Sequence, residues 1–323
     1  MKILITGGLG LIGHNVVKKL ELQGHEIFIT DTRTNYGIIP QTEIDYLISE
    51  RLKYIKTQKI HSINVVDKDS TEWLFKHYRP DTVIHLASFP RQKVVNANPA
   101  NGAQVMCEGL INLLEAGVKY GINKFMYASS SMVYGDFKDY VTEEAICKPQ
   151  GQYGIMKLAG EWLVKDYSRR DYFNHTIFRP SAVYGELDVE DRVISKFLLT
   201  AMRGEILKVN GINETLDFTY VDDAANGIVQ AMSTDNTNNK TYNITKSHSK
   251  TLYEAAKLAV KLAGSGNIEV REKDADFPSR GALDITAARQ DFNFDPKIDI
   301  EEGFERYYHW LKKSTYYSTN LLR

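Results

Sequence analysis

This chain of 323 residues has few cysteines, no large excess of positive or negative charge, and no long apolar run. Its two cysteines, Cys107 and Cys147, are too few for a disulfide framework, and no cysteine or histidine spacing suggests a zinc site. The formal net charge of −1 favours neither a nucleic-acid backbone nor an anionic membrane as partner. No run is long enough to span a bilayer, and the apolar start breaks at Gly7 and Gly8, unlike a signal peptide. These absences predict a cytoplasmic protein without a metal site, whose ligand is recognised by local features of the chain.

Strand-like and helix-like segments alternate along the first half. Short apolar runs predict strands at 2–6, 26–30, 82–86, 124–128 and 175–178. Helical periodicity between them predicts helices at 11–23, 104–120 and 152–168. This alternation is typical of right-handed crossovers and a parallel sheet covered on both faces. We therefore expect an α/β fold, a doubly wound parallel Rossmann sheet with its site at the carboxyl ends of the strands.

The alternation loosens in the second half. Helices are expected at 193–202, 252–262 and 304–311, and a short strand at 218–221. Asp222 or Asp223 is interpreted as the cap of a helix that begins near Ala224. We expect two parts: a Rossmann domain over 1–180, joined by about 215–247, and a smaller C-terminal α/β substrate lobe, mainly over 181–323.

A glycine-rich turn follows the first expected strand. Gly7 permits a tight turn, Gly10 lets the backbone approach a pyrophosphate, and Gly13 lets a helix pack on the sheet with its amino end toward the phosphates. Asp31 stands 18 residues after Gly13, where a carboxylate binds the adenosine ribose hydroxyls and repels a 2′-phosphate. Arg33 nearby favours the phosphorylated cofactor, but Asp31 is better placed. The pattern predicts NAD as the cofactor.

Tyr153 and Lys157 lie four residues apart on an expected helix, so their side chains point the same way. A free tyrosine has a pKa of about 10 and is a poor base near neutrality. An adjacent ammonium and an oxidised nicotinamide both favour the phenolate. Ser130 offers a hydroxyl to the reacting oxygen. Together the three residues predict proton and hydride transfer at an alcohol carbon, with Lys157 also holding the nicotinamide ribose.

Taken together, these segments resemble the extended short-chain dehydrogenase/reductases, and among them the NAD-dependent sugar-nucleotide epimerase/dehydratase family. The resemblance covers essentially the whole chain and is carried in order by residues 6–13, 85–87, 130–135, 153–157, 179–185 and 217–223. It implies NAD lying across the sheet and a nucleotide-sugar between the lobes. It also implies a homodimer joined by the helices around 104–120 and 153–168.

The resemblance also implies the residues that contact each ligand. Those implied for NAD are Gly7, Gly10, Leu11, Ile12, Gly13, Asp31, Thr32, Arg33, Asn64, Val65, Leu86, Ala87, Ser88, Ala128, Ser129, Tyr153, Lys157, Pro180 and Val183. Those implied for the substrate are Phe89, Arg91, Ser130, Ser131, Met132, Arg192, Val193, Lys208, Asn210, Lys273 and Arg280.

Positions that divide the family favour its 4-epimerase branch. The sugar 4,6-dehydratases and UDP-glucuronate decarboxylases carry a Glu just before their Tyr-Gly pair, where this chain has Ser131 and Met132. A thioether cannot move a proton. The GDP-fucose synthase type carries a Cys at the position of Met132 and a His shortly after Tyr184 and Gly185, where Glu186 follows here. The resemblance therefore implies that NAD oxidises C4, the keto-sugar turns over, and hydride returns to the other face.

Three positions depart from the family pattern. Met106 replaces an Asn near the nicotinamide, Ala182 replaces an Asn that meets the phosphate, and Leu216 replaces an Arg near the substrate diphosphate. The lost Arg removes a bidentate phosphate clamp. The candidates to compensate are Arg192, Lys208, Lys273 and Arg280. These departures keep open a net NAD(H)-dependent dehydrogenase or reductase of a sugar or other alcohol, and the fold alone leaves open a non-enzymatic NAD(H) sensor.

Overall fold

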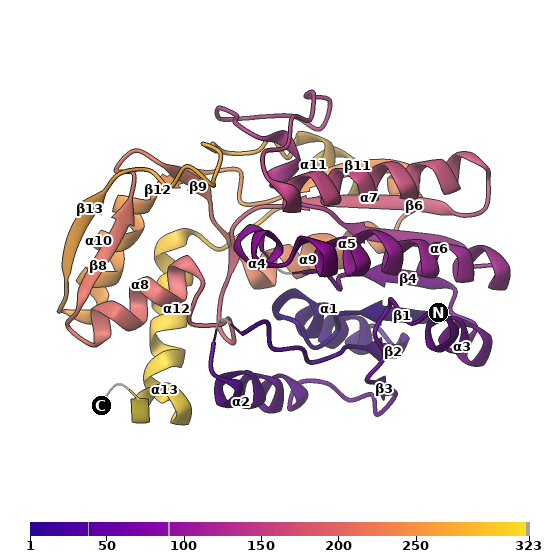
Figure 1. Ribbon diagram of the computed structural model, residues 1–323, viewed down its shortest axis with the longest axis horizontal. Helices are drawn as coiled ribbons and strands as arrows, with labels where there is room; N and C mark the ends of the chain where they lie inside the picture. Colours follow the sequence, from indigo (N-terminus) through magenta and orange to yellow (C-terminus); the bar gives the residue numbers. More distant parts are fainter. Residues whose placement is uncertain (38, 90, 321–323) are drawn as a thin grey trace.

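The computed structural model describes residues 1–37, 39–89 and 91–320. Its centre is a seven-stranded sheet in the order β11-β6-β5-β4-β1-β2-β3, with every neighbouring pair parallel (Figure 1). The strands are β1 Lys2–Thr6, β2 Glu26–Thr30, β3 Ile60–His61, β4 Thr82–His85, β5 Lys124–Ala128, β6 Asn174–Pro180 and β11 Lys240–Ile244. The strand order reverses between β1 and β4, as in a doubly wound fold, so the predicted fold class is confirmed.

Apolar side chains of the central strands alternate between two helix layers. Ile3 and Ile5 of β1 face the layer of α1 (Leu11–Leu22) and α9 (Val221–Met232), which pack on one another. Leu4 points to the opposite face, where its buried cluster includes residues of α3, α6 and α7. These helices are α3 Lys68–Tyr78, α6 Gly109–Tyr120 and α7 Gln152–Arg169. Both faces of the sheet are therefore buried, which explains why its strands are almost continuously apolar.

A second, smaller body of helices and short strands lies beside the sheet, on the left in Figure 1. Its buried core draws on α8, α10 and α12 and includes Phe197, Val209, Ala256 and Phe304. The helices are α8 Val193–Met202, α10 Leu252–Ala263, α12 Ile300–Lys313 and α13 Thr315–Asn320. Helix α11 (Thr286–Phe292) lies instead beside β11, and its Ala288 and Phe292 are buried in the cluster of the central sheet (Figure 1). The strand pairs are β7 Val183–Tyr184 with β10 Thr219–Tyr220, β8 Ile206–Asn210 with β13 Asn267–Arg271, and β9 Thr215–Asp217 with β12 Ser249–Thr251.

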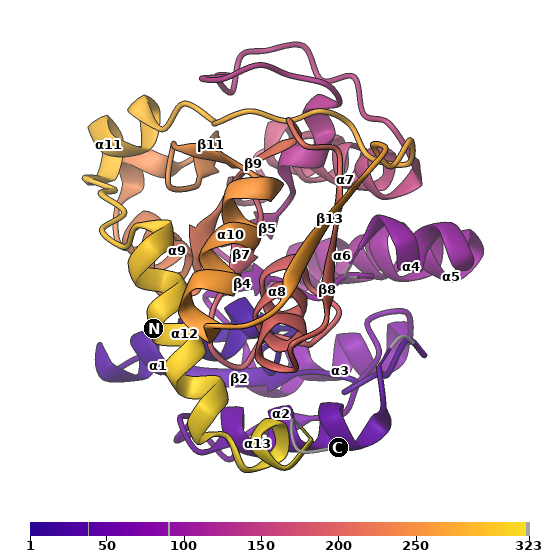
Figure 2. The same ribbon diagram turned by 90° about the vertical axis from the view of Figure 1, so that its left-hand side faces the viewer.

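One helix that the periodicity did not reveal joins the two bodies. In both views α2 (Gln41–Leu52) lies beside α13, the last helix of the described chain (Figures 1 and 2). Tyr46 of α2 bonds Ser314 at 2.9 Å and stacks on Tyr316. Helix α13 and the residue before it are thereby packed against α2.

The expected helix at 104–120 differs from the structure at its start. The short helices α4 (Gln92–Ala97) and α5 (Pro99–Ala103) lead into a π-helical turn, η1 (Gln104–Glu108), before regular α6 begins. Met106 is buried within this turn. A π turn at this place shifts the helical register by one residue, which simple periodicity cannot show.

The expected cap near Ala224 is wrong. Helix α9 begins earlier, at Val221, and neither aspartate caps it. Asp222 pairs with Lys19 of α1 at 2.6 Å, and Asp223 accepts a hydrogen bond from the Ile298 amide at 2.8 Å. Both carboxylates thus tie α9 to its neighbours. No helix in the described ranges is long and apolar enough to cross a bilayer.

Candidate active site

The predicted cofactor residues gather at one edge of the central sheet. The glycine turn follows β1, Asp31 follows β2, and Leu86, Ala87 and Ser88 follow β4. Ala128 ends β5, with Ser129 after it, and Pro180 ends β6. Parallel strands present their carboxyl ends together, so segments more than 170 residues apart in the sequence share this edge. Val183 lies on β7 next to this edge, and Asn64 and Val65 lie in the loop after β3.

The glycine turn has the shape of a phosphate cradle. Gly7 has φ +70°, and a Cβ there would lie 2.7 Å from the Ala87 amide nitrogen. A Cβ on Gly13 would lie 2.1 Å from the Gly7 carbonyl oxygen. In the described chain α1 starts at Leu11 without a capping side chain and without an acidic residue in its first turn. Its first amides, including those of Leu11 and Ile12, are thus available to an anionic group, and the turn fits a dinucleotide pyrophosphate.

Asp31 is held by the glycine turn itself. Its carboxylate accepts hydrogen bonds from the Leu9 amide at 2.9 Å and from the Arg33 amide at 2.8 Å. The carboxylate is half-buried, whereas Thr32 and Arg33 are exposed. A fixed carboxylate beyond β2 fits the ribose hydroxyls of NAD and disfavours a 2′-phosphate.

Ser130, Tyr153 and Lys157 meet next to the same edge. Ser130 begins the 3₁₀ turn η2 (Ser131–Tyr134), and Tyr153 and Lys157 lie one turn apart on α7. The hydroxyl of Ser130 lowers the pKa of Tyr153, and the Lys157 ammonium lies 5.8 Å from the centre of the Tyr153 ring. Lys157 is 4% exposed and donates to the Ala128 carbonyl at 2.7 Å. The structure brings the predicted trio together on two adjacent elements.

Two arginines act on the charge of the Tyr153 phenol. Burial raises the pKa of Tyr153, while Arg192, the hydrogen bond with Ser130, and Arg280 oppose that rise. Burial also lowers the pKa of Lys157 from 10.5 to about 7, against the opposing effect of Glu161. The two guanidinium groups, which the sequence assigned to substrate binding, are the cations that favour the Tyr153 phenolate.

A buried ion pair supports the trio from behind, and sequence inspection gave it no role. Glu161 lies one turn beyond Lys157 on α7 and is fully buried. Its carboxylate accepts from Arg179 Nε at 2.9 Å and Nη2 at 2.7 Å, and from the Ser129 hydroxyl at 2.5 Å. The two hydrogen bonds from Arg179 connect β6 to α7. The same Glu161 carboxylate also holds Ser129, the residue before Ser130. The four-residue spacing from Lys157 to Glu161 places both side chains on one face of the helix, and this was the signal in the sequence that could have revealed Glu161.

Of the residues implied for the sugar end, Phe89 and Arg192 are placed near Tyr153. Phe89 packs in a small buried cluster with Val95 and Met106, against which Tyr153 rests. Ser131 and Met132 are buried in η2. Arg192 and Val193 stand at the start of α8, and Arg91 forms an ion pair with Asp191.

The remaining implied substrate residues are spread over the smaller body. Lys208 and Asn210 lie on β8 with exposed side chains, and Lys273, just past β13, pairs with Glu214 at 3.5 Å. Arg280 is half-buried, and its Nε has no hydrogen-bond partner within the described residues. Of these four, Arg280 is the one whose charge reaches Tyr153.

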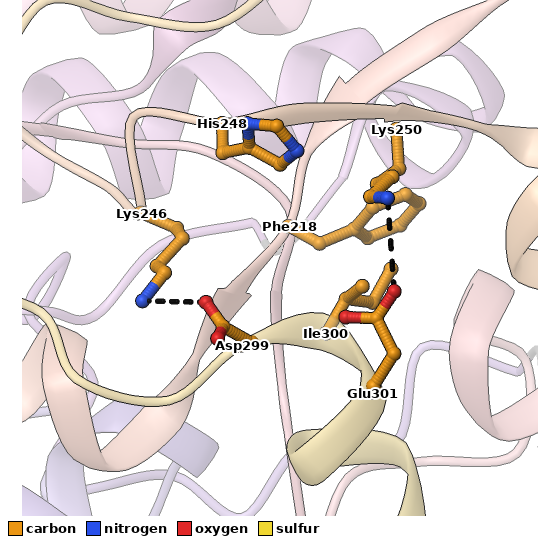
Figure 3. Close-up of a pocket in the computed structure, with 7 residues that line it drawn as sticks. All are labelled: Phe218, Lys246, His248, Lys250, Asp299, Ile300 and Glu301. Atoms are coloured by element: carbon orange, nitrogen blue, oxygen red, sulfur yellow. Dashed lines mark ion pairs between the residues drawn. The ribbon is translucent and has the colours of Figure 1, made fainter.

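A cavity of about 400 Å³ lies elsewhere, at the start of α12 (Figure 3). None of its lining residues belongs to the predicted site. Its two lysines are paired: Lys246 with Asp299 at 2.9 Å and Lys250 with Glu301 at 3.6 Å. Because its cations already have carboxylate partners, we do not assign it to the reaction. The described residues also contain no group of His, Cys, Asp and Glu that fits a metal ion.

Comparison with known proteins agrees with this geometry. The family model of the NAD dependent epimerase/dehydratase family matches residues 3–245. A putative UDP-glucose 4-epimerase of Methanocaldococcus jannaschii is 30% identical, covering 97% of this chain and 99% of its own. UDP-glucuronic acid decarboxylase 1 of Xenopus tropicalis is 27% identical, covering 99% of this chain and 74% of its own. The solved UDP-glucuronic acid 4-epimerase of Bacillus cereus, in complex with UDP-glucuronic acid and NAD, superposes with a TM-score of 0.88 at 25% identity, covering 97% of this chain and 99% of its own.

The match therefore extends over most of the sequence and over the whole fold, including the sheet edge where the glycine turn and Tyr153 meet. On this evidence the chain belongs to the NAD-dependent epimerase/dehydratase family of enzymes.

Proposed function

We propose that this protein is a nucleotide-sugar epimerase that inverts C4 of its substrate through transient oxidation. The observation that carries the proposal is the trio Ser130, Tyr153 and Lys157 beside the glycine turn, combined with Met132 where an acid for elimination would stand. Relatives support the choice of reaction, since the Methanocaldococcus jannaschii and Bacillus cereus proteins are named as 4-epimerases.

Each residue of the trio has one task. The glycine turn and Asp31 would hold NAD, which would supply the acceptor and donor of the C4 hydride. Tyr153 removes the C4 hydroxyl proton and later returns it, which needs a phenol whose anion is accessible. Ser130 hydrogen-bonds the reacting oxygen and thereby orients it. Lys157, held by the Ala128 carbonyl, binds the nicotinamide ribose. Met132 stands beside them and cannot move the additional proton that dehydration needs.

The substrate side is proposed to bind the diphosphate with arginines. Leu216 offers no charge, whereas Arg192 and Arg280 act on Tyr153 and carry the charge that a diphosphate requires. Uridine diphosphate sugars are the first substrates to test, because the Thermotoga maritima UDP-glucose 4-epimerase, 26% identical with a TM-score of 0.84 and covering 97% of this chain and 99% of its own, was solved with UDP-glucose.

Three further assignments belong to the proposal. Residues 1–180 with about 215–247 bind NAD, and 181–323 mainly bind the substrate. The active form is a homodimer joined through α6 and α7, which is supported by large exposed apolar side chains on these helices: Ile111, Ile155 and Trp162. A cytoplasmic location is supported by the two cysteines, which are unpaired.

The test is an assay of each purified UDP-sugar epimer with the protein, combined with mass spectrometry of what the protein releases on denaturation. We expect stoichiometric NAD or NADH in the released material and conversion of one epimer into a mixture without net change in NADH absorbance. Unchanged epimers together with one-for-one consumption of NAD would reject the epimerase in favour of a net dehydrogenase. The replacement of the phosphate-binding Arg by Leu216 is the observation that favours this second candidate.

A further inference from the structure

Arg51 is a buried guanidinium that forms no ion pair with a carboxylate in the part of the chain that the structure describes, although the charges of Asp188 and Asp31 act on it. It lies near the end of α2, is 7% exposed, and donates only to main-chain carbonyls. Nη1 donates to the Leu9 carbonyl at 2.8 Å, and Nη2 donates to the Leu187 carbonyl at 2.6 Å. Leu9 is part of the glycine turn, and Leu187 is part of the loop between β7 and α8. One planar group therefore links two segments that are 178 positions apart in the chain.

The first of these segments is the cofactor cradle. Leu9 stands between Gly8 and Gly10, and its amide is held by Asp31 at 2.9 Å. Its amide and carbonyl are thus both fixed, one by the proposed ribose carboxylate and the other by Arg51. Any ordering of this turn by NAD is transmitted to the Arg51 fork.

The second segment, residues 185–192, is called here the substrate-side loop. Its last residue is Arg192, directly before Val193 at the start of α8, and its Asp191 forms an ion pair with Arg91. Leu187 has φ +67°, a backbone conformation that a branched side chain rarely adopts without support. The hydrogen bond from Arg51 holds the carbonyl of that residue. The placement of Arg192 beside Tyr153 therefore depends on a loop whose support comes from α2.

Two other buried contacts hold the same loop, one from α2 and one from α12. Glu43 of α2 accepts from the Glu190 amide at 2.6 Å and from the Tyr317 hydroxyl at 2.7 Å. Tyr307 donates to the Asp188 carbonyl at 3.1 Å. Within the described residues, Arg51 is the side chain that donates hydrogen bonds both to this loop and to the glycine turn.

We propose that Arg51 is a positioning residue that couples NAD binding in the glycine turn to the placement of the substrate-side loop. The inference rests on the proposed function, because it takes the two ligands to be NAD and a nucleotide-sugar. When NAD fixes the turn, the guanidinium fixes Leu187 and the loop that follows. The nucleoside diphosphate then meets a loop that is already ordered, and by linkage its binding holds NAD more tightly by the same factor.

The experiment measures the rate of NAD release from the loaded protein with and without saturating UDP, with GDP and dTDP tested in parallel. In the wild type we expect the diphosphate that binds to slow release by about 10-fold, within the usual range of coupling between sites. In Arg51→Lys we expect less than about 2-fold slowing, because an ammonium does not reproduce the planar fork that serves two carbonyls. Arg51→Gln is the second variant, and far-UV circular dichroism verifies the fold of both.

Arg203→Gln is the matched control, since Arg203 pairs with Glu190 of the same loop but does not contact the glycine turn. We expect it to keep the wild-type slowing. A second test uses the wild type alone. Hydrogen exchange measured with and without NAD should show that NAD protects peptides covering 185–192.

Equal slowing in wild type and Arg51→Lys, or absence of protection by NAD, would overturn the coupling. A wild-type protein that epimerises a nucleotide-sugar but releases NAD at the same rate with and without the matching diphosphate would overturn this inference alone. A wild type that binds none of the three diphosphates would overturn the proposed function as well.

Discussion

At the scale of single residues, the proposed chemistry converges on the hydroxyl of Tyr153. Burial raises the pKa of this hydroxyl, and Arg192, the interaction with Ser130, and Arg280 oppose that rise. Tyr153→Phe removes one oxygen and leaves the packing against the Phe89 cluster in place. Because a positioned acid or base contributes typically about 10²–10⁴-fold, we expect epimerisation to fall by about that factor. The bound NAD content, measured after denaturation, should stay at the wild-type level.

The control for this substitution is Tyr172→Phe, which removes an exposed hydroxyl beyond the end of α7. It should leave the rate unchanged. If Tyr153→Phe retained more than a tenth of the wild-type rate, Tyr153 would not be the proton acceptor, and the arginines beside it would need another explanation.

At the scale of elements, the β1–turn–α1 unit is the most tightly constrained. A Cβ on Gly13 would lie 2.1 Å from the Gly7 carbonyl and 2.8 Å from Gly8 Cα, both main-chain atoms that cannot rotate away. We therefore expect Gly13→Ala to destabilise the fold by about 1–3 kcal/mol, as overpacking does, and to lose NAD. Thermal unfolding and the released nucleotide measure the two effects.

Gly10→Ala separates these two effects. Its Cβ would lie 3.1 Å from the Gly7 carbonyl, a tight but tolerable contact, and its φ is −70°. We expect nearly normal stability but weaker retention of NAD, because the added methyl obstructs the approach to the pyrophosphate. Equal stability of the Gly13 and Gly10 variants would contradict the crowding argument.

Elements with regular periodicity were predictable from the sequence, and elements with charged buried faces were not. The strands β1, β2 and β5 lie where their apolar runs predicted them, because both faces of a parallel sheet are buried. Helix α2 was missed because its inward face consists of Glu43, Leu47 and Arg51, two of which are charged. Apolar periodicity cannot identify a helix that buries hydrogen-bonded charge.

The same limit applies to the candidate site. The glycine turn, Asp31 and the Ser-Tyr-Lys trio follow from local spacing, since each lies next to its element in sequence. The Glu161–Arg179 pair and the Arg51 bridge join residues 18 and 136 positions apart, and only the packed fold shows them. The side chains that hold the site in place were therefore the least accessible to sequence reasoning.

At the scale of the whole molecule, the outer face of α7 offers a partner surface. Trp162 is 66% exposed and Ile155 is 52% exposed, two turns apart on one side of the helix. If the proposed homodimer forms there, Trp162→Glu should raise its dissociation constant by at least about 30-fold, as expected for a buried aromatic anchor. Sedimentation velocity over a concentration series measures this. Trp73→Glu, on α3, is the matched control: α3 packs on α6 but is not one of the two helices of the proposed interface, so the variant should leave the association unchanged.

The junction between the two bodies contains a titratable group that links stability to pH. Asp217 ends β9, is fully buried, and accepts a hydrogen bond from the Leu283 amide at 2.9 Å. Burial raises its pKa from 3.8 to about 6, although the Leu283 amide and the hydroxyl of Thr245 oppose the rise. The folded state therefore binds this proton more tightly than the unfolded state does.

The stabilisation from this proton is complete below about pH 4 and is lost as the pH rises through about 6, with a total of about 3 kcal/mol. Asp217→Asn has no proton to lose, and its amide oxygen still accepts from Leu283. Between pH 4 and pH 7 the wild type should therefore lose about that amount of unfolding free energy in urea relative to the variant. Asp276→Asn, an exposed carboxylate, should give a curve parallel to the wild type. A parallel curve for Asp217→Asn would instead show that Asp217 stays ionised in the fold and that its amide contacts outweigh its burial.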